Sequence, residues 1–233
     1  MRNNLFNKLY KPYILRRIYI ERLGEPFIYN FISIFVFFFG DLRAKIKYDL
    51  IPRESYAYGI LAAADLAKSN NINKISIIEF GVASGKGLLN MCYISKEVTK
   101  LTGVEFEIFG FDTGKGMPIP KDYRDHPEKY FTGDYPLINQ EKLINSLPKN
   151  AKLILGDIKK SLFEIEKQIT SPNGFVSVDV DYYSSTLDCL NIFQNDTTLY
   201  LPYVFTLMMF TILIIMIFVV NFWQLMSLIV PIN

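Results

Sequence analysis

Short runs of β-branched residues alternate with longer runs rich in Ala and Leu through residues 46–196. The short runs have the length and composition of buried strands, and the longer runs are typical of helices. Strands that are separated by helices pair in parallel, with right-handed crossovers. The pattern therefore predicts an α/β fold around a parallel sheet. Strands are predicted at Lys74–Phe80, Phe106–Phe111, Ala151–Leu155 and Phe175–Val180, and a fifth begins at Tyr200–Phe205; helices are predicted at Glu54–Lys68, Leu88–Leu101, 159–168 and Ser184–Phe193.

Each of the first four predicted strands ends in, or next to, an acidic residue. The carboxyl ends of parallel strands meet at one edge of a sheet, where ligands bind. A purely structural fold needs none of these carboxylates, whereas a nucleoside with ribose hydroxyls and an exocyclic amine would use several. The residues are Glu79, Asp112, Asp157, Asp179 and, two positions further on, Asp181.

A glycine-rich turn, Gly81–Gly87, follows the first predicted strand. Such a turn lets the backbone approach a ligand at the N-terminus of the next helix, although glycines after a strand also serve simply as turn formers. A phosphate-binding P-loop does not fit, because the first gap is one residue short and Gly87 replaces the magnesium-binding Ser or Thr. The dinucleotide fingerprint fails at Ala83 and Lys86. Glu79 would repel a pyrophosphate, so the pattern favours a ligand without phosphate.

This turn resembles the first motif of class I S-adenosylmethionine-dependent methyltransferases. The block Val178–Thr186 (VDVDYYSST) resembles the D-x-D-x-Y-x-S-T block of macrocin O-methyltransferase-like enzymes, and Gly110–Pro118 is similar to their second-strand motif. The resemblance covers about residues 50–205, with the three motifs in order at strand ends. It implies a Rossmann-like methyltransferase fold, a parallel sheet with flanking helices.

The resemblance also implies a binding site for S-adenosylmethionine. The glycines would line the methionine portion of this cofactor, Asp112 would hold the ribose hydroxyls, and Asp157 would lie near the adenine. The residues assigned to the cofactor in this way are Glu79, Gly81, Gly85, Gly87, Asp112 and Asp157.

Asp179 and Asp181 would be candidates for a magnesium site that orients a hydroxyl of the methyl acceptor, with Asp179 as the candidate catalytic residue. Carboxylate oxygens suit Mg²⁺, and coordination would lower the pKa of the hydroxyl. The acceptor expected from the resemblance is a small hydroxylated molecule such as a sugar.

Simpler explanations exist for Asp157 and Asp181, and also for the histidine His126. Asp157 is equally suited to capping the helix that follows it, and Asp181 to capping the helix that begins near Ser184. His126, the only histidine, lies in a polar loop and is better explained as a solvated loop residue than as a general base.

Residues 1–45 form a basic and aromatic extension. Residues 1–50 carry nine Lys and Arg against four Asp and Glu, whereas residues 51–196 carry sixteen against nineteen. Residues 1–24 suit either a basic amphipathic helix on an acidic membrane surface or, as we prefer, a solvated helical extension that packs on the domain. Residues 25–45 are expected to form a buried helix or a docking segment. The apolar run Phe31–Phe39 is too short to span a bilayer.

Residues 197–233 contain no charged residue. Leu199–Trp223 is long enough to cross a membrane, so one interpretation is a C-terminal transmembrane helix after a sheet truncated at strand five. Accordingly, we divide the chain into an extension (1–45), a partial methyltransferase domain (46–205) and an uncharged tail (206–233).

A shift of reading frame is the second interpretation of the tail, and the one we prefer. If the frame slips just before Thr206, each original codon joins the last base of one printed codon to the first two of the next. Met208-Met209 then forces Asp, Met209-Phe210 forces Val, and Leu207-Met208 permits Asp. The hidden sequence Tyr-x-Asp-Asp-Val lies where macrocin-type enzymes carry a second acidic pair. A chain that lacks this pair is expected to be inactive or unstable, and tight binding of S-adenosylmethionine would count against that expectation.

The leading hypothesis is therefore S-adenosylmethionine-dependent methyl transfer to a hydroxyl of a small molecule. Mg²⁺ is a second candidate cofactor. The alternatives are a membrane-anchored protein without catalytic activity and a different Rossmann nucleotide-binding enzyme. Cys92 and Cys189 lie in apolar stretches, which argues against a disulfide framework and favours a reducing compartment. We expect a cytoplasmic domain, membrane attachment only if the tail is genuine, and no nucleic-acid partner. The sequence leaves the oligomeric state undetermined.

Overall fold

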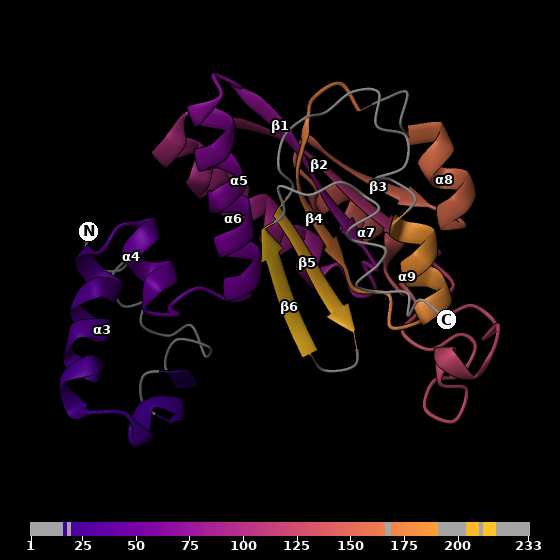
Figure 1. Ribbon diagram of the computed structural model, residues 1–233, viewed down its shortest axis with the longest axis horizontal. Coiled ribbons are helices and arrows are strands. Elements are labelled where there is room, and N and C mark those ends of the chain that lie inside the picture. Colours follow the sequence, from indigo (N-terminus) through magenta and orange to yellow (C-terminus); the bar gives the residue numbers. More distant parts are fainter. Residues whose placement is uncertain (1–15, 18–19, 166–168, 191–203, 210–211, 218–233) are drawn as a thin grey trace, which may run out of the picture. The chain divides into compact units, whose positions relative to one another are not determined.

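The computed structural model describes residues 16–17, 20–165, 169–190, 204–209 and 212–217 (Figure 1). The chain divides into two compact units, Met1–Tyr58 and Gly59–Asn233, which are considered separately below. The boundary between them falls within one helix, α5 (Glu54–Ser69).

The first unit contains a short 3-10 helix, η1 (Glu21–Gly24), and the helices α3 (Phe27–Phe39) and α4 (Leu42–Lys47). Helix α3 ends at Gly40, whose N–H donates to the Val36 carbonyl at 2.8 Å. Asp41 then caps α4, because its side chain accepts from the Ala44 N–H at 2.8 Å. A small core forms where α3 and the segment after α4 meet; its buried members are Val36, Phe37 and Leu50.

The second unit is built on a six-stranded sheet in the order β3-β2-β1-β4-β5-β6. Strands β1 to β5 pair in parallel with one another, and β6 pairs antiparallel with β5. The chain crosses from one side of β1 to the other after β3, as in a doubly wound Rossmann-like fold. The predicted α/β class is therefore confirmed. The strands are β1 (Lys74–Phe80), β2 (Glu105–Asp112), β3 (Ala151–Leu155), β4 (Asn173–Val178), β5 (Val204–Met209) and β6 (Ile212–Ile217).

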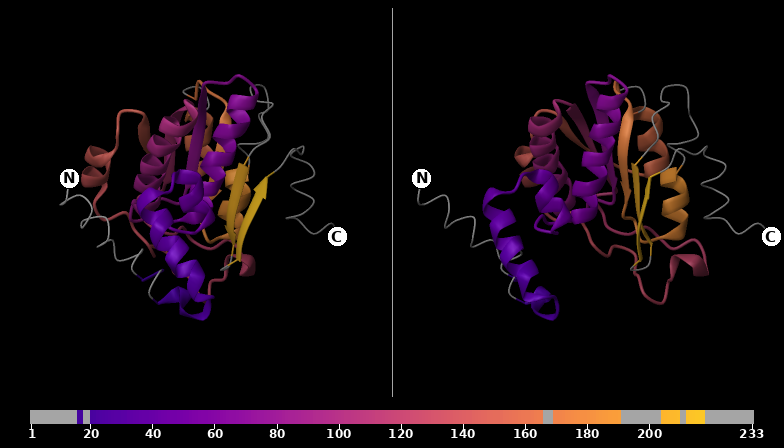
Figure 2. Two further views of the ribbon diagram at one scale, coloured as in Figure 1. Left: turned by 90° about the vertical axis from the view of Figure 1, so that its left-hand side faces the viewer. Right: turned by 60° about the vertical axis from the view of Figure 1, so that its left-hand side comes forward.

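Helices lie on both faces of this sheet (Figure 2). The central strand β1 is consequently buried from Ile75 to Phe80, which explains why its sequence is apolar without alternation. A Cβ on Gly174 of β4 would lie 3.2 Å from the Ala63 Cβ, so α5 packs closely over this part of the sheet. The remaining helices are α6 (Lys86–Thr102), α7 (Gln140–Ser146), α8 (Ile158–Ile165) and α9 (Tyr183–Leu190), with a 3-10 helix, η2 (Tyr123–Asp125), in the loop after β2.

The prediction of an apolar helix in the tail is wrong for the part that the structure describes. Val204–Met209 and Ile212–Ile217 are strands of one hairpin, and the first of them pairs with β4. Ile and Val favour extended backbone because their branched Cβ packs well on a pleated surface. The sheet thus continues past a fifth strand. No helix in the described ranges is both long and apolar enough to cross a membrane.

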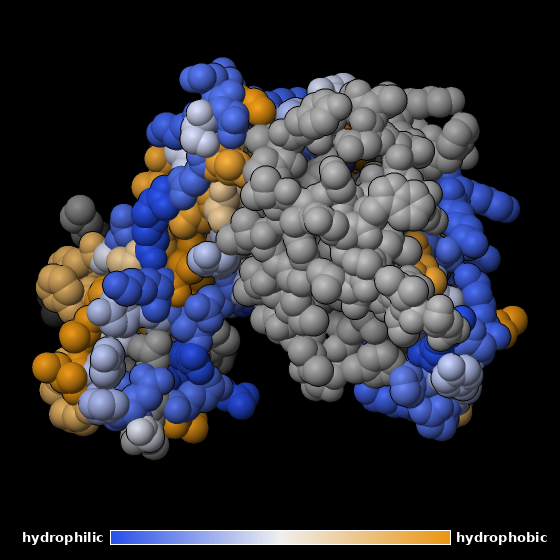
Figure 3. All heavy atoms as spheres, viewed as in Figure 1, coloured by the Kyte–Doolittle hydropathy of each residue, from blue (hydrophilic) through white to orange (hydrophobic). Residues whose placement is uncertain are grey.

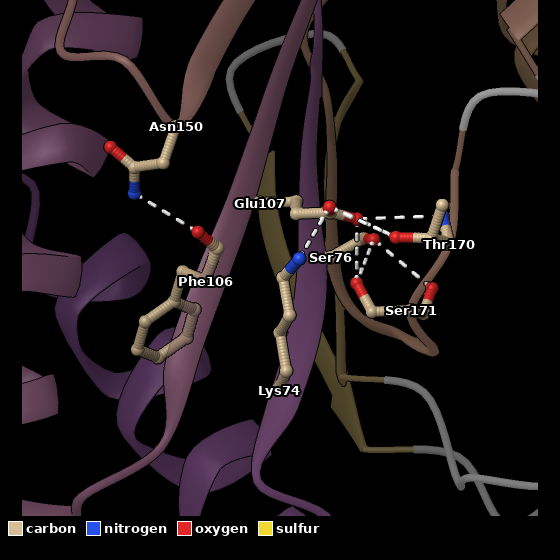
Figure 4. Close-up of polar contacts among 7 residues, drawn as sticks. All are labelled: Lys74, Ser76, Phe106, Glu107, Asn150, Thr170 and Ser171. Carbon is tan, nitrogen blue, oxygen red and sulfur yellow. Dashed lines mark hydrogen bonds and ion pairs between the residues drawn. The ribbon is translucent and has the colours of Figure 1, made fainter.

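Polar contacts join the strands at the edge where β1, β2 and β4 begin, opposite the edge with the acidic strand ends (Figure 4). The Glu107 carboxylate accepts from Lys74 Nζ at 2.6 Å, Ser171 Oγ at 2.8 Å and Thr170 Oγ1 at 3.0 Å. Partial burial raises the pKa of Glu107, but the hydrogen bonds from these three partners outweigh it and hold the pKa below its ordinary value. This network holds the starts of the strands together. The candidate site lies at the opposite edge of the sheet, where the strands end.

Candidate functional site

The glycine turn connects β1 to α6 at the carboxyl edge of the sheet. Gly81 has a φ of +86°, which only glycine adopts without strain. A Cβ at this position would overlap the carbonyl oxygen of Asp179, so the turn lies directly against the end of β4. The glycine is therefore required by the close approach of two strand ends, whether or not a ligand binds there.

Glu79 lies beneath the start of α6 and is only 1% exposed. A Cβ on Gly87 would overlap Glu79 Oε1, so the absent side chain of Gly87 is what admits the carboxylate. The N-terminus of a helix favours a negative charge at this place. The structure thus explains two of the predicted cofactor residues as one packing unit.

Asp112, the last residue of β2, holds the glycine turn through its side chain. Its Oδ2 atom accepts from the N–H groups of Val82 at 2.9 Å and Ala83 at 2.8 Å, and its Oδ1 atom accepts from the Gly114 N–H at 2.7 Å. Each carboxylate oxygen has two lone pairs, so the side chain keeps capacity for a ligand. The sequence pattern singled out Asp112 as a ligand-binding residue and did not indicate this role in shaping the turn.

Helix α7 covers the remaining glycine of the turn, Gly85. A Cβ there would lie 2.6 Å from the Leu143 Cδ1 atom, and Gln140 Nε2 donates to the Gly114 carbonyl at 3.3 Å. Leu143 is itself buried, at 6% exposure. The sequence pattern did not indicate α7, because an apolar pattern within seven residues is too short to predict a helix.

Asp157 follows β3 and begins α8. Its Oδ1 atom accepts from the Lys159 N–H at 3.1 Å, which is the geometry of a helix cap. Of the two explanations considered for this residue, the capping one has a visible contact. Contact with an adenine stays a prediction.

Asp179 and Asp181 follow β4 and are half-buried. The Asp179 N–H donates to the Phe80 carbonyl at 2.9 Å, which extends the pairing of β4 with β1 past the strand end. Asp181 has a φ of +58°, an uncommon value for a residue with a side chain. Its Oδ1 atom accepts from the Tyr130 hydroxyl at 3.1 Å. Within the described residues, no three His, Cys, Asp or Glu side chains gather as a metal site, so the magnesium assignment stays a prediction.

Asp125 caps α9, and no sequence pattern indicated it as a functional residue. It is fully buried, and its Oδ1 and Oδ2 atoms accept from the N–H and the Oγ–H of Ser184, each at 2.8 Å. Oδ2 also accepts from the Lys121 N–H at 2.8 Å. These contacts attach the loop after β2 to the helix after Asp181. The two partners are 59 residues apart in the chain, so no local sequence pattern connects them.

The same loop contributes Tyr130 and His126. Tyr130 packs edge-on against Tyr182 at 6.1 Å between ring centroids, and both are buried with Met117. His126 is partly exposed, and its Nδ1 atom lies 2.7 Å from Glu128 Oε1. A contact between two neighbours in a surface turn agrees with the loop explanation of this histidine.

Of three comparisons with known proteins, the comparison with solved structures gives matches. No protein-family model matches the chain, and no curated protein matches it in sequence. Among solved structures, the chain is similar to the crystal structure of CalS11, a calicheamicin methyltransferase. The sequence identity is 18%, the alignment covers 83% of this chain and 76% of that chain, and the TM-score is 0.47.

Proposed function

We propose that the second unit is an S-adenosylmethionine-dependent methyltransferase domain. The observation that carries the proposal is the glycine turn at the edge of the sheet, backed by the buried carboxylate of Glu79 and shaped by Asp112. A cationic sulfonium ligand is attracted by carboxylates that would repel a pyrophosphate. This charge arrangement favours the methyl donor over dinucleotides and nucleoside triphosphates.

The proposed binding mode follows the strand ends. Gly81, Gly85 and Gly87 would border the methionine portion, the one remaining lone pair on Asp112 Oδ1 would accept from a ribose hydroxyl, and Asp157 would lie near the adenine. The acceptor hydroxyl would approach from the β4 edge, near Asp179 and Asp181, where a divalent cation would be held if one is used.

The proposed reaction is a direct displacement at the methyl carbon. When bound, the cofactor supplies an electrophilic methyl group, so that a carbon–sulfur bond breaks as a carbon–oxygen bond forms. The protein must align the acceptor oxygen with that bond and accommodate the departing hydroxyl proton, for which Asp179 is the proposed group. Positioning supplies most of the acceleration in such a reaction.

Isothermal calorimetry with S-adenosylmethionine, NAD and ATP tests the proposal. Folding of the chain is established first by circular dichroism. Of the three, we expect only S-adenosylmethionine to bind, and to bind weakly because the chain lacks the second acidic pair. Ser84→Trp should abolish this binding, because Ser84 is the exposed tip of the turn. The matched control is Ser69→Trp at the exposed end of α5. A folded chain that binds NAD or ATP, or that binds none of the three, would reject the proposal.

We also propose that the tail from about Thr206 is translated out of its original frame. Strand β5 pairs Val178 of β4 with Leu207, so positions 208 and 209 continue alongside Asp179 and Val180. The hidden Asp-Asp pair would therefore lie next to the acidic end of β4 and complete a cluster of carboxylates there. The nucleotide sequence provides the test: early stop codons in the shifted frame, or absence of the two Asp codons, would contradict the proposal.

A further inference from the structure

Helix α3 of the first unit exposes a row of four phenylalanines, one every four residues. Phe27, Phe31, Phe35 and Phe39 are 73%, 60%, 64% and 76% exposed. They form two ring pairs, with centroids 4.9 Å apart for Phe27 and Phe31 and 5.0 Å apart for Phe35 and Phe39. Figure 3 shows apolar side chains gathered over α3 at the left of the view. We call these four residues the phenylalanine row.

The opposite side of α3 is already used in the core of the first unit. Val36 and Phe37 are 8% and 7% exposed and are packed with Leu50. The helix has no charged residue, and its buried Ser33 hydroxyl donates to the Tyr29 carbonyl at 2.7 Å. A helix at a water surface normally presents charged residues outward, which α3 does not. An exposed apolar patch of this kind is typical of a surface that contacts a membrane or another protein.

The length of α3 restricts how it can meet a bilayer. Its thirteen residues span roughly 20 Å at about 1.5 Å per residue, which is less than the hydrocarbon core of about 30 Å. The helix is therefore suited to lying in the interface of one leaflet, with the phenylalanine row toward the acyl chains.

The charge of residues 1–50 indicates which kind of surface α3 contacts. Residues 1–50 carry nine Lys and Arg against four Asp and Glu, whereas residues 51–196 have an acidic excess. Two copies of the basic segment would repel each other, which disfavours self-association through the phenylalanine row. Anionic lipid headgroups have the complementary charge and an apolar layer directly beneath them. We propose that the phenylalanine row docks the protein on an anionic lipid surface.

Co-sedimentation of the full chain with vesicles tests this proposal, which is independent of the proposed methyl transfer. Two vesicle types are compared: phosphatidylcholine alone, and phosphatidylcholine mixed with phosphatidylglycerol. We expect binding to the mixed vesicles, weakened by added salt, and much weaker binding to phosphatidylcholine alone. The double variant Phe31→Ser/Phe35→Ser is expected to lose about tenfold or more in affinity for the mixed vesicles.

The matched control is Phe131→Ser, which makes the same change at a phenylalanine of the second unit that is 65% exposed. It should bind as the unchanged chain does. Circular dichroism checks that the double variant is folded, and the exposure of both side chains makes folding the expected result. The proposal is overturned if the unchanged chain ignores the mixed vesicles, or if the double variant binds them equally well, as it would if the uncharged tail were the anchor. Concentration-dependent self-association that only the double variant abolishes would equally overturn it, in favour of a second copy as the partner.

Discussion

Replacing Asp125 by Ala would remove the side chain that attaches the loop after β2 to α9. Three donors would lose their acceptor: the N–H groups of Lys121 and Ser184 and the hydroxyl of Ser184. Lys121 is an exposed residue of the loop, whereas Ser184 is half-buried and lies at the start of α9. The main cost therefore arises at Ser184.

The magnitude follows from these contacts. A hydrogen bond to a charged acceptor contributes about 1.5–3 kcal/mol, and loss of a helix cap costs about 1 kcal/mol. Relief from holding a fully buried carboxylate offsets part of this loss. We expect a net destabilisation of about 3 kcal/mol, which for a unit of this size lowers the melting temperature by about 6–12 °C.

Differential scanning calorimetry and urea unfolding measure this change in Asp125→Ala. The control is Asp122→Ala, which makes the same substitution three residues earlier. Within the described residues, this partly exposed carboxylate accepts hydrogen bonds from Arg124. It should leave the melting temperature almost unchanged. A double-mutant cycle with Ser184→Ala isolates the pair. If Asp125→Ala unfolds at the same temperature as Asp122→Ala, or if the cycle shows no coupling, the attachment of the loop through Asp125 is refuted.

Three further outcomes are expected. The pKa of Glu107 is lowered, so its contribution to stability is complete above the ordinary pKa of a Glu and is lost as the pH falls through the lower folded-state value. In urea unfolding, the difference in stability between the unchanged chain and Glu107→Gln should therefore shrink as the pH is lowered through the acid range, and a constant difference would contradict this. Partial burial, and then the charge of Glu79, raise the pKa of Cys92 to about 12, and full burial raises that of Cys189. Ellman's reagent at pH about 8 should therefore label neither thiol quickly until the protein is denatured, and rapid labelling of the native chain would contradict the raised pKa of both thiols. Gly87→Ala should destabilise the fold by roughly 1–2 kcal/mol in urea unfolding, because the added Cβ displaces the Glu79 carboxylate and this cost outweighs the better helix propensity of Ala. A stabilised variant would show that the Glu79 carboxylate is not held against Gly87.

The pattern of the sequence was sufficient for the first four strands of the sheet, of which β1 and β4 are buried along almost their whole length and β3 is a partly exposed edge strand. The predicted bounds of β1 and β3 agree with the structure, and those of β2 and β4 differ by two residues or fewer at each end. A strand that is buried on both faces needs a continuous apolar run, and such a run is visible without any tertiary information. The tail was different, since a run of apolar residues is equally suited to a helix or a strand. Pairing with β4 decides between them.

The sequence by itself determined which residues stand at the carboxyl edge of the sheet, because strand ends are local features. It identified Glu79, Asp112 and Asp179 there, along with the glycines between the first strand and the next helix. Only the tertiary structure decided what each side chain contacts. Asp112 shapes the turn by accepting from backbone N–H groups 29 and 30 residues away, and Asp125 caps a helix 59 residues further along the chain. Contacts of that separation depend on how loops return across the sheet edge, which periodicity and local propensity do not encode.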